Sequence, residues 1–252
     1  MFAGREILAA AGGAWPLAWT GAVVFVAYAL RGATGFGAGV VSIPLLLLAL
    51  PLPVVIPFVT AVGMIASFGQ AVHQRRFVDG TALRKLVVPS LVGVAAGLWL
   101  FSALDPGLLR NALAIFIIGY ALSAYLPRRA ARPAPAWLGP FAGAAGGFVA
   151  TVFGGMAGPL YVVYLRSRAL DKARFRATMS LSLLCLSALR AAGYGTLGFY
   201  DARVLWLLGA ALPVVGLAMV AGDLWHAKLD EARFGHVVAG LLALSGAALL
   251  FK

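Results

Sequence analysis

The stretch that decides the fold reads RGATGFGAGVVSIP, from Arg31 to Pro44, and a second stretch of the chain matches its pattern. The second stretch reads GGFVATVFGGMAGP, from Gly146 to Pro159, and both lie inside long apolar regions. Glycine clusters at that depth leave backbone N–H and C=O groups without helical partners. Because hydrocarbon offers no hydrogen bonds, those groups must face protein, water or a ligand. We therefore expect the two glycine-rich breaks to form a substrate site.

The composition is that of a protein embedded in a lipid bilayer. Of the 252 residues, 62% are hydrophobic and 11% are charged, whereas soluble proteins carry about a quarter charged residues. We predict an all-α polytopic membrane protein. The formal charge of +12 does not indicate a nucleic-acid partner, because the basic residues lie in short loops between apolar spans. The single cysteine, Cys185, and the absence of a Cys/His cluster predict no metal site and no cofactor.

The chain divides into two repeats joined by a basic, proline-rich linker. The halves align at an offset of 119 residues, which places Gly35 on Gly154 and Gly39 on Gly158. Internal duplication of this kind is typical of transporters whose site lies at the repeat interface. The predicted boundaries are 1–126 for repeat 1 (broken segment 17–50; spans 54–73, 86–103 and 108–126), 127–136 for the linker, and 137–252 for repeat 2 (broken segment 138–165; spans 177–197, 204–222 and 234–251).

The lysines and arginines decide how the broken segments fold. If each broken segment crosses the membrane, eight spans result and the basic loop residues split 10 to 8 between the two sides. If each returns as a re-entrant hairpin, six full spans result and the split is 14 to 4, which obeys the positive-inside rule. The apolar half 17–30 is also shorter than the roughly 20 residues of a spanning helix. We predict re-entrant hairpins, inverted repeats, cytoplasmic basic loops and both termini outside.

Each break is followed by a short helix that we expect to begin inside the protein, near Gly39 and near Pro159. A helix N-terminus carries free N–H groups and the positive end of the helix dipole, which together favour an anion. Glycine lets a ligand approach those amides. The alternative is that the glycines serve only tight helix packing, as an isolated GxxxG motif usually does. Clusters of glycines at matched places favour the functional interpretation.

Few polar residues lie within the spans, and they complete the candidate site. Arg190 lies deep in the span 177–197, where a charge is costly and usually functional; the alternative is an arginine that reaches the outer interface. No span carries Asp or Glu in its interior, so the intramembrane charge favours an anion. Gln70 and His73 are coupling candidates, or interfacial residues, if protons drive transport. The predicted substrate-binding residues are Thr34, Gly35, Gly37, Gly39, Thr60, Gly154, Gly155, Gly158, Thr178 and Arg190.

At these breaks the chain resembles the TauE/SafE (sulfite exporter, TSUP) family of membrane permeases. The stretch GFGAGVVSIP, residues 35–44, is similar to its first glycine motif, with Ala38 at a usual glycine position. The stretch GGMAGPLY, residues 154–161, is similar to the second and departs from it at Met156 and Ala157. FRAT, residues 175–178, also matches, and the similarity covers nearly the whole chain. The resemblance implies a bacterial inner-membrane permease that moves sulfite, sulfonates or related sulfur anions, often outward.

We therefore predict a secondary transporter, and no enzyme, that exports a small sulfur-containing anion such as sulfite or an organosulfonate by alternating access. A permease for another small organic or inorganic anion is the nearest alternative. An intramembrane serine protease would need a serine in a GxSx context with a histidine at similar depth. Ser245 lacks the glycine two residues before it, and the histidines His73, His226 and His236 lie near span ends. The oligomeric state is open.

Overall fold

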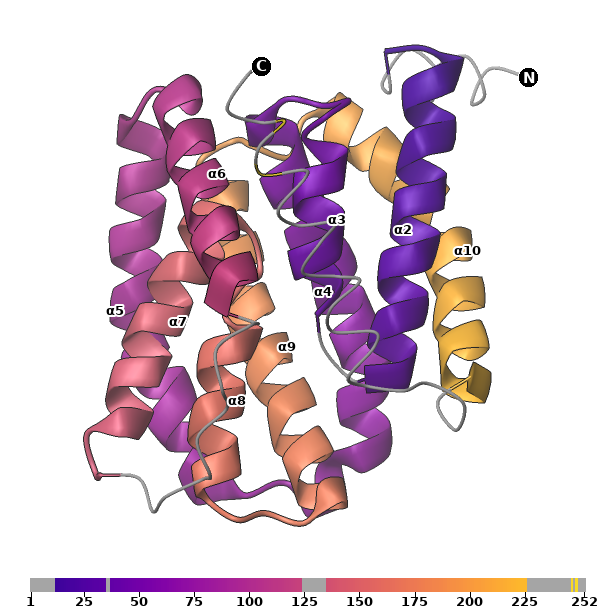
Figure 1. Cartoon of the computed structure of the whole chain (residues 1–252). Helices are drawn as coiled ribbons and strands as arrows, with labels where there is room; N and C mark the ends of the chain where they lie inside the picture. Colours follow the sequence, from indigo (N-terminus) through magenta and orange to yellow (C-terminus); the bar gives the residue numbers. More distant parts are fainter. Residues whose placement is uncertain (1–11, 35–36, 124–134, 226–245, 247, 249–252) are drawn as a thin grey trace. The chain divides into compact units, whose positions relative to one another are not determined.

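The computed structural model describes residues 12–34, 37–123, 135–225, 246 and 248, and over these residues the chain forms helices and no strand (Figure 1). The predicted all-α class is confirmed. The predicted span 234–251 lies almost wholly outside the described residues. The helices are α2 (Ala14–Thr34), α3 (Ala38–Leu46), α4 (Leu52–Gln74), the short 3₁₀ turn η1 (Arg75–Phe77), α5 (Gly80–Ala103), α6 (Pro106–Ser123), α7 (Leu138–Phe153), α8 (Gly158–Ser167), α9 (Lys172–Thr196) and α10 (Ala202–Trp225).

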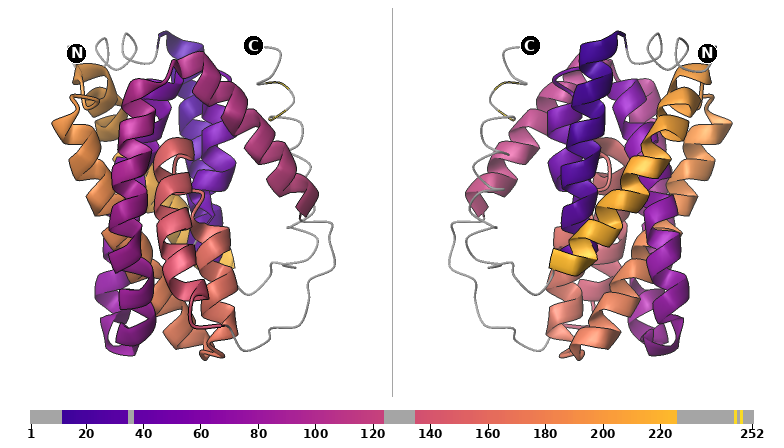
Figure 2. Two further views of the ribbon diagram at one scale, coloured as in Figure 1. Left: turned by 90° about the vertical axis from the view of Figure 1, so that its left-hand side faces the viewer. Right: turned by 90° about the vertical axis from the view of Figure 1, so that its right-hand side faces the viewer.

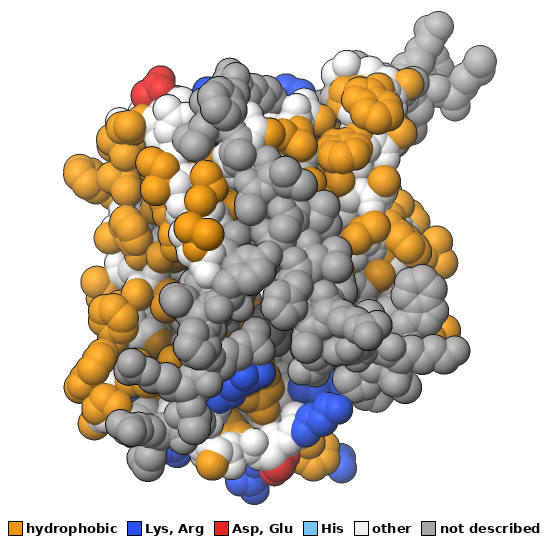
Figure 3. Space-filling model, in the orientation of Figure 1, with side chains coloured by type: hydrophobic (Ala, Val, Ile, Leu, Met, Phe, Trp, Pro, Cys, Tyr) orange, Lys and Arg blue, Asp and Glu red, His pale blue; other side chains and the backbone are white. Residues whose placement is uncertain are grey.

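Several of these helices are built to lie in lipid. On α5 the outward-facing side chains include Val88, Val92 and Trp99, and hydrophobic side chains cover this side of the molecule in Figure 3. An apolar surface of this extent is rarely exposed to water, so the chain is a polytopic membrane protein. The stretches long and apolar enough to cross a membrane, among the described residues, are Ala14–Ala33, Leu52–Val72, Gly80–Ala103 and Ala202–Leu224.

The chain folds into two compact units, and each takes segments from both halves of the sequence. Unit 1 comprises Met1–Val59, Leu104–Arg128 and Phe199–Lys252, and unit 2 comprises Thr60–Ala103 and Arg129–Gly198. Within unit 1, α2 and α10 lie side by side, as the right-hand view of Figure 2 shows. The first glycine-rich break belongs to unit 1 and the second to unit 2. The inverted relation of the two sequence repeats stays a prediction.

Both broken segments are antiparallel helical hairpins. In unit 1 the indole Nε1 of Trp19, near the start of α2, donates to the carbonyl of Leu45, near the end of α3, at 2.8 Å. In unit 2 the start of α7 packs on the end of α8, since the ring of Tyr164 lies against Gly139. Each broken segment is therefore an antiparallel pair of helices. Helix α2, with 21 residues, is long enough to cross a bilayer, unlike the short apolar half predicted over 17–30. The re-entrant hairpins predicted over 17–50 and 138–165 stay a prediction.

Helices α7 and α8 are both shorter than a helix that spans a bilayer. These helices have 16 and 10 residues, which correspond to about 24 Å and about 15 Å at the helical rise per residue. A hydrocarbon core is about 30 Å thick. These lengths are compatible with the re-entrant interpretation, which stays a prediction.

Glycines form the seam between α5 and α7 of unit 2. A Cβ atom on Gly147 would lie 2.5 Å from the carbonyl oxygen of Ser90, and one on Gly93 would overlap the carbonyl of Ala144. The two backbones therefore touch, which only glycine allows. At Gly146 a Cβ atom would lie 2.5 Å from the Tyr161 ring. The packing interpretation of the glycines is thus correct for Gly146 and Gly147.

Two helices begin earlier than the apolar pattern predicts. Helix α5 begins at Gly80 rather than at residue 86, and α9 begins at Lys172 rather than at residue 177. Asp79 and Asp171 precede these starts, and each accepts hydrogen bonds from backbone N–H groups of the first turn. Aspartate caps of this kind stabilise helix starts, so the helices extend beyond the apolar stretch into the basic loops.

The two basic loops of unit 2 lie at the same end of the unit. The carboxylate of Asp79, after α4, lies 3.8 Å from the Arg168 guanidinium, after α8. Figure 3 shows lysine and arginine side chains along this lower edge. Eight full spans would place these loops on opposite sides of the membrane, whereas re-entrant hairpins place them on the same side. The contact therefore supports the hairpin arrangement.

Single cysteines test this arrangement in a Cys185→Ser background, since Cys185 is the only cysteine of the chain. We expect Arg76→Cys and Lys172→Cys to react with an impermeant maleimide from one side of the membrane, and Thr196→Cys, at the far end of α9, from the other side. Labelling of Arg76→Cys and Thr196→Cys from the same side, with Lys172→Cys opposite, would contradict it.

Candidate functional site: a buried arginine beside the second helix break

The end of α7 requires glycine. Gly154 has a φ of 74°, in the left-handed region where side chains are strained, and it caps the C-terminus of α7. Its N–H donates to the carbonyl of Ala150, and so does the N–H of Gly155, at 2.9 Å. Gly154 and Gly155 therefore shape the turn, and their amides are used within the protein rather than presented to a ligand.

Helix α8 begins directly after this turn, at Gly158. No side chain caps its N-terminus, and Pro159 lies in the first turn, where its missing N–H costs nothing. The first-turn N–H groups of a helix have no partner within the helix. Gly158 is therefore the one predicted glycine of this break whose amide lies where an anion would be bound by a helix N-terminus.

Arg190, on α9, is buried in unit 2 with neutral partners. It is 1% exposed, and its Nη2 atom donates to the hydroxyl of Thr60 on α4 at 2.6 Å. Its Cζ atom lies 5.9 Å from the ring centroid of Tyr194, within cation–π range. The Nε atom is buried without a hydrogen-bond partner, and no carboxylate of the described residues pairs with the guanidinium. Arg190 and Thr60, two of the predicted substrate-binding residues, are therefore in contact, and their binding of a substrate stays a prediction.

Tyr161 brings the start of α8 close to this charge. It lies in the first turn of α8 and is fully buried, its hydroxyl makes no hydrogen bond to the described residues, and it interacts electrostatically with Arg190. Helices α4, α8 and α9 therefore contribute to one buried cluster, which we call the Arg190 cluster: Thr60, Tyr161, Arg190 and Tyr194. A guanidinium with an unpartnered Nε, hydroxyl groups and a nearby helix start are groups that bind a small anion.

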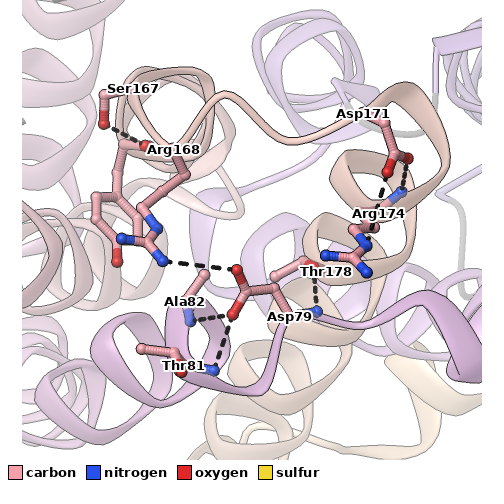
Figure 4. A network of polar contacts seen from close by, with 9 residues as sticks. Asp79, Thr81, Ala82, Ser167, Arg168, Asp171, Arg174 and Thr178 are labelled. Carbon is pink, nitrogen blue, oxygen red and sulfur yellow. Dashed lines mark hydrogen bonds and ion pairs between the residues drawn. The ribbon is translucent and has the colours of Figure 1, made fainter. Parts of the chain in front are cut away.

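Thr178 lies elsewhere, in a network at the loop end of unit 2 (Figure 4). Its hydroxyl oxygen accepts a hydrogen bond from the N–H of Asp79 at 2.9 Å. The Asp79 carboxylate accepts from the N–H groups of Thr81 and Ala82 and pairs with Arg168. Thr178 is twelve residues before Arg190 on α9, about 18 Å along the helix axis. The structure gives it a role in joining α9 to the start of α5.

The predicted site residues of the first glycine-rich break belong to unit 1, whereas Arg190 belongs to unit 2. In unit 1, Gly37 has a φ of 94° and is the N-cap of α3, with Gly39 in the first turn and no side-chain cap. Gly35 and the side chain of Thr34 lie outside the described residues. That these residues join the Arg190 cluster stays a prediction.

The coupling candidates lie on the second half of α4. Gln70 is half-buried, and its Oε1 atom is buried without a hydrogen-bond partner among the described residues. His73 lies at the end of α4, and the structure does not describe its side chain. Ser245, His226 and His236 lie outside the described residues. Proton coupling through Gln70 or His73 stays a prediction.

Tyr194 is a member of the cluster that the sequence interpretation missed. It follows Arg190 by four residues on α9, and such a spacing places two side chains on the same face of a helix. That spacing is the signal that could have identified it. An aromatic residue in an apolar span otherwise looks like an ordinary core side chain.

Helical hairpins and a buried charge within a polytopic helical protein are features of membrane transporters. The chain belongs to the family described as Sulfite exporter TauE/SafE, whose family model matches residues 20–249. The resemblance stated from the glycine motifs is therefore confirmed. No curated protein and no solved structure matches the chain.

The Asp79 network predicts a measurable difference between two substitutions. Asp79→Ala removes the cap of α5 and the ion pair with Arg168, and we expect it to lower the free energy of unfolding by about 1–2 kcal/mol. Asp79→Asn keeps a capping oxygen and loses only a partly exposed ion pair, so its effect should stay below about 1 kcal/mol. Chemical denaturation in mixed micelles measures both.

Asp171→Asn is the matched control, because it also keeps a cap and removes an exposed ion pair, here with Arg174. It should leave stability unchanged. Equal destabilisation by Asp79→Asn and Asp79→Ala would show that the ion pair, not the cap, holds the network together.

Proposed function

We propose that this chain exports a small sulfur-containing anion, such as sulfite or an organosulfonate, and binds it at the Arg190 cluster. Alternating access exposes this cluster to one side of the membrane and then to the other. The anion contacts the guanidinium of Arg190 and the first-turn amides of α8. The participation of the first glycine-rich break stays a prediction of the duplicated sequence.

The observation that carries the proposal is that Arg190 is buried and pairs with no carboxylate among the described residues. A charged group removed from water costs several kcal/mol unless an opposite charge or hydrogen bonds compensate it. The hydroxyl of Thr60 and the side chain of Tyr194, which contact Arg190, are neutral and supply no opposite charge. An anionic substrate supplies the opposite charge. Ionisable residues within membrane spans usually mark a transport pathway for this reason.

The surroundings of the break favour a small anion. Met156 and Ala157, which replace the usual residues of the second glycine motif, are buried at 2% and 0% exposure. Their side chains occupy space directly before the start of α8. We therefore expect the amide of Gly158 to favour a compact oxyanion over a bulky organic acid. Family membership supports sulfur as the central atom.

Transport into proteoliposomes tests the proposal with Arg190→Met, which keeps the volume and removes the charge. We expect saturable sulfite flux for the unchanged protein and a loss of about 10- to 100-fold in kcat/KM for the variant. A hydrogen bond to a charged group contributes about 1.5–3 kcal/mol, which gives this range. Methanesulfonate and acetate, measured in parallel, separate a sulfur-anion carrier from a general anion permease.

Arg174→Met is the control, because Arg174 lies on the same helix, is exposed and pairs with Asp171. Its flux should match that of the unchanged protein. Equal sulfite flux in Arg190→Met and Arg174→Met would refute the assignment of Arg190.

A further inference from the structure

The break after α7 frees a backbone carbonyl that a normal helix would satisfy. In a continuous helix the carbonyl of Thr151 would accept from the N–H of Gly155. Here the N–H groups of Gly154 and Gly155 both donate to Ala150. The carbonyl of Thr151 is therefore left for another donor, and Thr151 is fully buried. A buried carbonyl without a partner would cost about 1–3 kcal/mol.

The hydroxyl of Tyr194, on α9, donates its hydrogen bond to this carbonyl. The same side chain contacts Arg190, one turn before it, through the ring face, with 5.9 Å between the guanidinium carbon and the ring centroid. Tyr194 is fully buried and packs edge-on against Phe101 of α5, with 5.3 Å between the ring centroids. Phe101 of α5 thus packs on the ring, the carbonyl of Thr151 binds the hydroxyl, and Arg190 lies over the ring.

We infer that Tyr194 is a positioning residue of the anion site, since it fixes the broken end of α7 relative to Arg190. The inference rests on the proposed function and adds a residue to it. The hydroxyl holds the α7–α8 turn, and therefore the start of α8, at a set distance from α9. The ring holds the guanidinium. A movement of the hairpin during transport is transmitted to Arg190 through this one side chain.

Tyr164 is a second buried tyrosine of unit 2, and its hydroxyl does not bond to the break. It lies on the same hairpin, near the end of α8, and packs on Gly139 of α7. Its hydroxyl is buried and makes no hydrogen bond to the described residues. Removal of the Tyr164 hydroxyl therefore breaks no contact at the turn. It provides a matched control for Tyr194.

Tyr194→Phe keeps the ring beside Arg190 and removes the hydroxyl, which bonds the carbonyl of Thr151 and also interacts with Arg190. We expect the KM for sulfite in proteoliposomes to rise about three- to tenfold, the effect of one lost hydrogen bond, with a smaller change in maximal rate. Amides of residues 151–160 should exchange hydrogen faster, because the turn has lost its anchor. In an Arg190→Met background the added substitution should change KM little, since the coupled partner is gone. Tyr164→Phe should change neither KM nor exchange.

Faster exchange with an unchanged KM would reduce Tyr194 to a structural residue and overturn the inference, as would unchanged exchange. If the unchanged protein carries neither sulfite nor methanesulfonate, the proposed function fails. In that case the exchange comparison of Tyr194→Phe with Tyr164→Phe still decides whether Tyr194 anchors the break.

Discussion

The positive charge of Arg190, held out of water in unit 2, is the constraint on which the rest of the unit depends. Its guanidinium donates a hydrogen bond to the hydroxyl of Thr60 on α4. It also lies over the ring of Tyr194, one turn further along α9. It lies within electrostatic range of Tyr161, in the first turn of α8. A buried charge with neutral neighbours is poorly stabilised, and this makes an anion its natural partner.

The helix break beside this charge is the second constraint, because every backbone group that it frees must find a partner within protein. The N–H groups of Gly154 and Gly155 both donate to the carbonyl of Ala150. The carbonyl of Thr151 accepts a hydrogen bond from the hydroxyl of Tyr194. No side chain caps the start of α8. These hydrogen bonds hold the broken end of α7, and in our proposal the start of α8 faces the ligand.

The parts of the fold that could be predicted from the sequence are those that the lipid environment constrains. Hydrocarbon tolerates no unpaired backbone and few charges, so the apolar spans, the hairpins and the depth of Arg190 could be read from composition and loop arginines. What the pattern missed depends on single hydrogen bonds. The caps at Asp79 and Asp171 extended α5 and α9, and the N–H of Asp79 donates to the hydroxyl of Thr178 within the loop network. Tyr194 was missed because its role depends on a carbonyl that only the geometry of the break frees.

The most direct test of the buried charge compares thermal unfolding of the purified protein and Arg190→Met, with and without sulfite. Replacement of a poorly compensated buried charge by an apolar side chain of similar size is often neutral or stabilising. We predict that Arg190→Met without anion unfolds at the same or a higher temperature. Sulfite at ten times its dissociation constant should stabilise the unchanged protein by about 1.4 kcal/mol and the variant not at all. A less stable variant that sulfite still stabilises equally would contradict the account.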